Sequence, residues 1–174
     1  MAKVLIIIPP ERFRDEEFFI TNEELEKAGH KITISSTKLG VINGSRGGNT
    51  NSQILINHIN TSDFEAVVFI GGGGSKLLFN DQDAARIAKE MFKQKKVVSA
   101  ICLAPVILAN AGILIGKKAT VAGTESKTIE AKGATYTGPG VTVDGNIITA
   151  NAPKASLFFA QKINDSLKEA EIVA

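Results

Sequence analysis

The sequence predicts an α/β protein in which a mostly parallel sheet carries helices on both faces. Short runs of β-branched and other apolar residues alternate along the chain with stretches whose apolar residues recur at helical spacing. The runs lack polar alternation, as is typical of strands buried on both sides. With 174 residues, of which 44% are hydrophobic and 22% charged, we expect one domain spanning residues 1–174.

The first half of the chain contains three clear strands and two helices. Glu16 and Glu17 lie in the first turn of the first helix, where the helix dipole favours carboxylates, and Gly29 follows its end. Asn80 is expected to cap the second helix. Glycines punctuate residues 37–60, where the sequence indicates only a short strand at 54–56. The other predicted elements are strand 4–8, helix 15–28, strand 31–35, strand 66–70 and helix 81–94.

The second half continues the same alternation. A buried strand leads directly into Cys102, and Gly112 ends the helix that follows. Asp144-Gly145 is a typical two-residue hairpin turn, and Pro153 suits the first turn of the last helix. The predicted elements are strand 97–101, helix 106–111, strand 119–121, helix 125–132, hairpin 141–150 and a helix from 153 to 168.

Charge and cysteine content narrow the functional classes. Acids and bases are mixed along the chain, the formal net charge is +2, and no basic block predicts a nucleic-acid partner. No apolar run approaches the roughly 18 residues that span a bilayer, so we expect no membrane partner. The single cysteine cannot form an internal disulfide, which favours the cytoplasm. No ligand-like spacing predicts a metal, and no motif predicts a cofactor.

Two strand ends are candidates for a functional site. Cys102 lies between a strand and a helix, and ligand sites in open α/β sheets lie beyond the carboxyl ends of the strands. The N–H groups and dipole at a helix N-terminus favour the thiolate. Strand 66–70 runs into four glycines, 71–74, which allow backbone N–H groups to approach a developing negative charge. The alternatives are a small buried cysteine and a flexible or phosphate-binding turn.

These segments, taken together, resemble the DJ-1/PfpI family over essentially the whole chain. The stretch AICLAP (100–105) is similar to the family's nucleophile elbow. The resemblance implies a flavodoxin-like three-layer sandwich with the cysteine at that elbow. The other similar stretches are FRDEE (13–17), AGH (28–30), EAVVFIGG (65–72), ANAGIL (109–114), GKKAT (116–120) and DGNIIT (144–149).

The resemblance also implies roles for individual residues. Cys102 corresponds to the family's reactive nucleophile and Glu17 to the first-helix glutamate held beside the thiol. Glu17 could instead be an ordinary solvated carboxylate of a first helical turn, with Glu16 as the alternative partner. The backbone N–H groups of Gly72 and Leu103 correspond to the family's oxyanion donors.

Arg46 and Gly71 are further candidates for the site or for a dimer contact. Arg46 matches an arginine that some members place at a dimer contact near the site, although a solvated loop arginine fits its position equally well. Gly71 belongs to the same glycine-rich strand end as the predicted oxyanion donor. Family members commonly form dimers or larger rings, so the resemblance implies a homo-oligomer.

The chain departs from the family at two histidine positions. One branch carries histidine at the position of Leu103, and another at about the position of Ala122. The only histidines, His30 and His58, are expected at the surface, away from Cys102. Amide hydrolysis needs an acid to protonate the leaving amine, so an intracellular cysteine protease of the PfpI type is disfavoured.

The resemblance favours chemistry that needs no histidine. A thiolate, one proton-transferring group and an oxyanion pocket suffice for a glyoxalase or deglycase that acts on small reactive aldehydes or their protein adducts in a stress response. The alternatives are a redox-responsive protein without catalysis and a family member that has lost activity.

Overall fold

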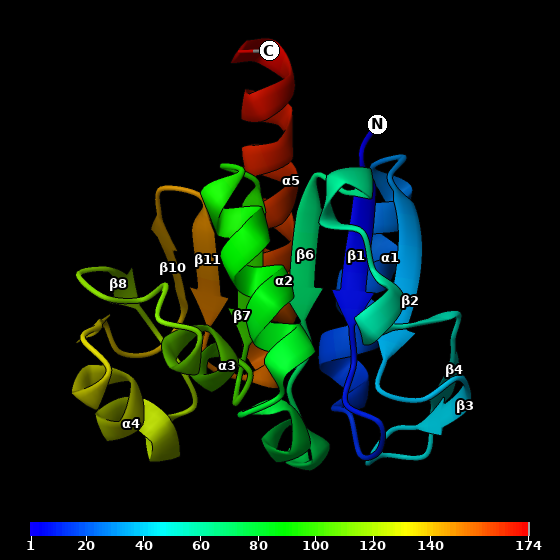
Figure 1. Cartoon of the computed structure of the whole chain (residues 1–174), viewed down its shortest axis with the longest axis horizontal. Helices are drawn as coiled ribbons and strands as arrows, with labels where there is room; N and C mark the ends of the chain where they lie inside the picture. Colours follow the sequence, from blue (N-terminus) through cyan, green and yellow to red (C-terminus); the bar gives the residue numbers. More distant parts are fainter. Residues whose placement is uncertain (174) are drawn as a thin grey trace.

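The structure is a computed structural model that describes residues 1–173. A seven-stranded sheet forms its centre (Figure 1). Its strands are β1 (Lys3–Ile7), β2 (Lys31–Ser36), β5 (Ile54–Leu55), β6 (Ala66–Phe69), β7 (Val97–Ile101), β10 (Val141–Asp144) and β11 (Ile147–Ala150). Their order is β10-β11-β7-β6-β1-β2-β5. The β10–β11 pair is antiparallel and all other neighbours are parallel, which confirms the predicted mostly parallel sheet.

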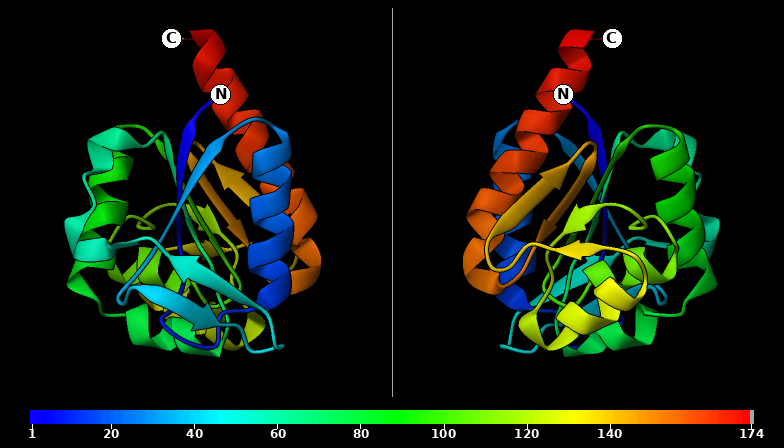
Figure 2. Two further views of the ribbon diagram at one scale, coloured as in Figure 1. Left: turned by 90° about the vertical axis from the view of Figure 1, so that its right-hand side faces the viewer. Right: turned by 90° about the vertical axis from the view of Figure 1, so that its left-hand side faces the viewer.

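Helices cover both faces of this sheet, as Figure 2 shows edge-on. They are α1 (Asp15–Lys27) and α5 (Ser156–Val173) on one face, and α2 (Gln82–Lys93) and α3 (Pro105–Asn110) on the other. Along β1, Val4 and Ile6 join the core beneath α1 and α5, whereas Leu5 and Ile7 join the core beneath α2 and α3. The unbroken apolar strands therefore serve two hydrophobic cores, as buried parallel strands should.

Two small sheets lie outside the central one. Strands β3 (Gly40–Asn43) and β4 (Asn49–Ser52) form an antiparallel hairpin that the sequence did not reveal. The second pairs β8 (Lys118–Ala119) with β9 (Thr135–Tyr136) in parallel, close to α4 (Ser126–Ala131). The predicted strand at 119–121 is therefore shorter than expected and pairs outside the central sheet.

The β3–β4 turn is held by a buried carboxylate at the start of α1. The Asp15 Oδ1 atom accepts a hydrogen bond from the backbone N–H of Arg46 at 2.8 Å, and Oδ2 accepts one from Gly48 at 2.7 Å. The hairpin is thus fixed to the helix that carries Glu17.

The N-cap of α2 differs from the prediction. Asp81, not Asn80, caps the helix, and its Oδ1 accepts hydrogen bonds from the N–H groups of Asp83 and Ala84, both at 2.9 Å. Asn80 lies one residue too early to reach these donors.

The last helix is also longer than predicted. Pro153–Ala155 forms a 3₁₀ turn, and α5 then continues to Val173, past the amino end of the sheet (Figure 1). Within residues 1–173, no helix combines the length and apolar character needed to cross a membrane.

Candidate active site

The carboxyl ends of β6, β7 and β11 bring the predicted site residues to one edge of the sheet (Figure 1). Cys102 follows β7, Gly71 lies just beyond β6, and Glu17 approaches from the first turn of α1. This edge is where open α/β sheets place their ligands.

The backbone at Cys102 is held from both sides in an uncommon conformation. Its φ is 63°, in the left-handed region that residues other than glycine rarely adopt. Its N–H donates to the carbonyl of Ala150 at 2.9 Å, and its carbonyl accepts from the N–H of Ala122 at 2.7 Å. The side chain is partly exposed, so the sulfur lies where the core meets the surface.

Glu17 is fully buried, which excludes the alternative of a solvated helix carboxylate. Its Oε1 accepts a hydrogen bond from the N–H of Gly71 at 2.9 Å. Its Oε2 is also buried and has no hydrogen-bond partner among residues 1–173. The carboxyl group lies close enough to the Cys102 thiol for each to affect the pKa of the other. The structure therefore brings Glu17 and Cys102 together.

Gly71 lies between these two side chains. A Cβ atom on Gly71 would lie 2.7 Å from Glu17 Oε1 and 3.0 Å from the Cys102 Cβ. Only glycine leaves room for the close approach of the carboxyl group and the cysteine.

Burial dominates the protonation of Glu17. It raises the pKa of this carboxyl to about 8, although hydrogen bonds from Gly71 and Cys102 and the charge of Arg14 act in the opposite direction. At neutral pH the group is therefore mainly protonated, and a protonated Oε2 can donate a hydrogen bond to the sulfur.

The pKa of the Cys102 thiol is raised, which contradicts the expectation that the helix N-terminus favours the thiolate. Burial first, and then the charge of an ionised Glu17, raise the pKa of Cys102 to about 12, whereas the N–H of Leu103 lowers it. The charge of Glu17 is absent while that carboxyl is protonated. The two groups therefore titrate as a coupled pair, and the proton that remains after the first ionisation lies between the oxygen and the sulfur.

The backbone N–H groups of the predicted oxyanion donors are not paired with oxygen in the described part of the chain, although that of Leu103 acts on the Cys102 sulfur. Neither Gly72 nor Leu103 donates its backbone N–H to an oxygen there. Gly72 has a φ of 107°, and a Cβ atom on it would lie 2.5 Å from the backbone of residues 12 and 14. Their role in stabilising an oxyanion stays a prediction.

The arginine predicted from the resemblance lies near the site, and a second arginine lies closer. Arg46 is exposed in the β3–β4 turn. The pKa of Glu16 is lowered mainly by its hydrogen bond with Arg14 and only slightly by the charge of Arg46. Arg14 occupies the N-cap position of α1 without a side-chain capping hydrogen bond. It forms an ion pair with Glu16 at 2.8 Å, and its charge also acts on Cys102. Sequence reasoning missed Arg14, although its place directly before three acidic residues at a helix start was a visible signal.

Neither histidine lies with the cysteine. His30 precedes β2 at the amino ends of the strands, the opposite edge from Cys102. Its Nδ1 accepts from the N–H of Ala2 at 3.0 Å, and its Nε2 lies 3.0 Å from Asn164 Oδ1. His58 is exposed on a 3₁₀ turn that packs against α2.

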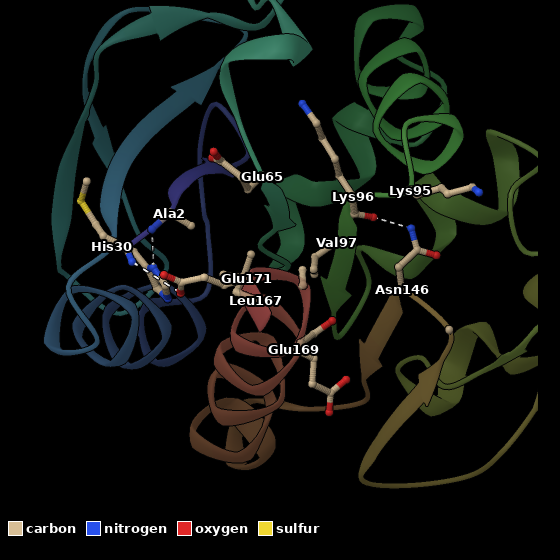
Figure 3. A pocket seen from close by; sticks show the side chains of 14 residues that line it. Ala2, His30, Glu65, Lys95, Lys96, Val97, Asn146, Leu167, Glu169 and Glu171 are labelled. Atoms are coloured by element: carbon tan, nitrogen blue, oxygen red, sulfur yellow. Dashed lines mark hydrogen bonds and ion pairs between the residues drawn. The ribbon is translucent and has the colours of Figure 1, made fainter. Parts of the chain in front are cut away.

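A cavity of about 560 Å³ at the amino ends of the strands is a poorer candidate (Figure 3). It contains none of the predicted site residues, and several of its polar groups are already paired. Lys96 Nζ donates to the carbonyl of Thr61 at 2.8 Å, and the Asn146 amide donates to the carbonyl of Lys96. The described residues also contain no group of three or more His, Cys, Asp or Glu side chains that could hold a metal ion.

Comparison with known proteins relates the chain to one family. A sequence model of the DJ-1/PfpI family matches residues 2–166. The chain belongs to the DJ-1/PfpI family. Among relatives of this DJ-1/PfpI protein, an uncharacterized protein of Methanocaldococcus jannaschii is 42% identical over 171 residues, which is 97% of this chain and 83% of that protein. A deglycase of Pyrococcus abyssi is 33% identical over 150 residues, 86% of this chain and 90% of the relative.

A solved structure extends the family likeness to three dimensions. The crystal structure of a ThiJ/PfpI domain protein from Brachyspira murdochii superposes with a TM-score of 0.94 at 34% identity and covers 96% of both chains. This likeness confirms the predicted three-layer fold.

Proposed function

We propose that this DJ-1/PfpI protein is a cysteine-dependent enzyme that acts on small reactive aldehydes, such as methylglyoxal, or on their adducts with proteins. The proposal depends on one observation: the Glu17 carboxyl is fully buried and lies across Gly71 from Cys102, the only cysteine. Burial raises the pKa of this carboxyl to about 8. A group with a pKa this close to neutrality can both accept and return a proton. The relative from Pyrococcus abyssi that is named a deglycase supports this reaction class.

The reaction begins with addition of sulfur to the aldehyde carbon. The reacting form is the fraction of the protein in which Glu17 is ionised. As the S–C bond forms, the thiol proton moves to the Glu17 carboxylate, and the carbonyl electron pair moves to oxygen. The N–H groups of Gly72 and Leu103 stabilise that oxyanion, which takes the proton from Glu17 to give a hemithioacetal.

Methylglyoxal then needs two further proton shifts. Glu17 removes the proton from the sulfur-bound carbon and returns it to the neighbouring carbon, while the hydroxyl proton on the sulfur-bound carbon moves to the neighbouring oxygen. The hemithioacetal thereby becomes a thioester of lactate. Water cleaves the thioester, lactate leaves and the thiol is restored. The sum is methylglyoxal plus water to lactate, with no external oxidant or reductant.

The test compares methylglyoxal consumption by the native protein with that of Cys102→Ala and Glu17→Gln variants. We expect both substitutions to lower kcat/KM by at least about 100-fold, because each removes a group that acts on the reacting atoms. Glu16→Gln is the control, since Glu16 lies on the same helical turn but is paired with Arg14. Equal rates in all four proteins would end the proposal.

A redox-responsive role is the second candidate, because a protonated carboxyl beside the sulfur can donate to an oxidised sulfur. Hydrogen peroxide would transfer one oxygen at a time to the thiolate, giving a sulfenic and then a sulfinic acid and releasing water at each step. Intact-mass analysis after mild peroxide treatment tests this role. A Cys102 that gains no oxygen while it still reacts with iodoacetamide would exclude it.

The sequence also raised a protease role, a loss of activity, an oligomeric state and a cellular role. A PfpI-type protease stays disfavoured, because Leu103 and Ala122 occupy the positions at which family branches carry histidine. A member that has lost activity is the outcome if neither test succeeds. We also propose that copies of the chain assemble into a dimer or larger homo-oligomer, and that the protein serves a stress response in the cytoplasm.

A further inference from the structure

A hollow of about 470 Å³ lies between the start of α1, the helix that carries Glu17, and the segment that enters α5. One wall contains Arg14, whose N–H donates at 3.0 Å to the carbonyl of Gly71, the residue between Glu17 and Cys102. The other wall contains Pro153 and Lys154. This wall follows directly from β11, whose last carbonyl, that of Ala150, accepts the N–H of Cys102. One wall is thus held to Gly71, and the other continues from the strand end that holds Cys102.

The charged side chains of this hollow leave a positive surplus. Arg14 and Lys154 are cationic, and Glu16 is the one acidic residue in its lining. Glu16 occupies Nε and Nη2 of Arg14, at 3.1 and 2.8 Å, but within residues 1–173 the Nη1 atom has no hydrogen-bond partner. One guanidinium nitrogen is therefore available for a ligand.

Apolar side chains complete the hollow. Ile20 of α1 and Leu157 of α5 line it, and both are partly exposed, at 36% and 47%. A ligand with a short carbon chain and one negative end would match both features of the lining. A surplus of one positive charge suits a singly charged carboxylate better than a doubly charged phosphate ester.

We propose that this hollow is a subsite for the carboxylate of the substrate, so that the preferred aldehydes carry a carboxylate that Arg14 Nη1 and Lys154 Nζ hold while the carbonyl faces Cys102. The identity of the aldehyde rests on the proposed function. The preference for a carboxylate does not, because it can be measured on the thiol without catalysis.

The experiment compares two alkylating reagents of nearly equal size, iodoacetate and iodoacetamide, which differ by one negative charge. Each forms the same S–C bond with Cys102 and releases iodide, so any effect on the ionisation of the thiol cancels in the ratio of their rates. Both rates are referred to those of 2-mercaptoethanol under the same conditions. We expect Cys102 to favour iodoacetate over iodoacetamide by about threefold or more relative to the free thiol, and added salt to reduce this preference.

Charge-removing variants locate the preference. Arg14→Gln and Lys154→Gln should each lower the iodoacetate-to-iodoacetamide ratio by about threefold, and the double variant should abolish the preference. Lys168→Gln is the matched control, since it removes the same charge from an exposed position of α5 that does not line the hollow. Glu16→Gln should raise the ratio, because it releases the other nitrogens of Arg14.

The outcomes separate this subsite from the proposed function. An unchanged ratio in both Arg14→Gln and Lys154→Gln, or an equal fall in Lys168→Gln, would overturn the subsite even if the protein consumes methylglyoxal. A charge preference that both variants abolish would support the subsite even if no aldehyde is consumed. Lys154→Gln alone decides the matter if Arg14→Gln fails to fold.

Discussion

At Glu17, burial and hydrogen bonding act on one carboxyl group in opposite directions. Burial is the larger effect, so the acid is mainly protonated at neutral pH. The state of this group then decides whether the nearby sulfur meets a hydrogen-bond donor or a negative charge. The chemistry of the site therefore depends on the proton of Glu17 as much as on that of the thiol.

Replacing Glu17 by Gln should shift the pH dependence of Cys102 alkylation. The variant has no carboxylate charge, which raises the pKa of the thiol in the native protein. Between pH 8 and 10, iodoacetamide should modify the Gln variant faster, by up to about tenfold, while the two proteins should differ little at pH 6. Glu16→Gln is the control, and superimposable profiles for Glu17→Gln and the native protein would contradict the prediction.

Gly71→Ala should disturb the same pair by steric means. The added Cβ would lie 2.7 Å from Glu17 Oε1 and from the Ile101 carbonyl, so side chain or backbone must shift. We expect a loss of about 1–3 kcal/mol in the free energy of unfolding, measured in urea, together with slower thiol alkylation. Gly123→Ala is the control, since a Cβ there would meet nothing within 4 Å. Equal stability of the two variants would argue against the close packing at Gly71.

Among the helices, α2 offers a direct test of its N-terminus. Asp81→Ala removes an acceptor that pairs with two backbone N–H groups, and it should cost about 1 kcal/mol of stability in thermal or urea unfolding. Asn80→Ala, at the residue that the sequence suggested, should change stability by no more than about 0.5 kcal/mol. A larger loss at Asn80 than at Asp81 would reverse the assignment.

The predictable elements are those whose sequence pattern has one physical explanation. The run that forms β7 has to be buried on both sides, and the predicted strand is confirmed at the same residues. The β3–β4 hairpin could not be found in this way, because its short strands have little alternation. Its position depends instead on the Asp15 carboxylate, which is distant in sequence. A contact of that kind has no local signature.

For the molecule as a whole, the buried acid makes stability depend on pH. The pKa of Glu17 rises from an ordinary 4.5 to about 8 on folding, so its stabilising contribution is complete below pH 4.5 and is lost as the pH rises through 8. Across that window the slope approaches about 1.4 kcal/mol per pH unit. Cys102 does not interfere, because its ordinary pKa is 9.0 and rises further on folding.

Urea unfolding of native protein and Glu17→Gln at several pH values between 5 and 8 measures this dependence. The stability of the native protein relative to the variant should fall steadily with pH. A constant difference would show that Glu17 is ionised in the folded protein at neutral pH.

The candidate site illustrates how far the sequence alone extends. The strand-end position of Cys102 was readable from the pattern, whereas the pairing with Glu17 came from the family resemblance, because a first-turn glutamate is usually solvated. The raised pKa of the thiol was unforeseen. It results from burial by several distant segments, which no local pattern records.

The turn at residue 102 is held by hydrogen bonds of its backbone, so its conformation does not depend on the reactive side-chain atom. Hydrogen bonds from Ala122 and to Ala150 involve only the peptide groups, so an exchange of the side-chain element would leave the fold of the turn intact. With selenium in place of sulfur, the chain would carry a nucleophile that ionises more readily than the thiol, because a selenol is the stronger acid. With an alcohol, the same pocket would become a receptor that holds aldehydes without consuming them.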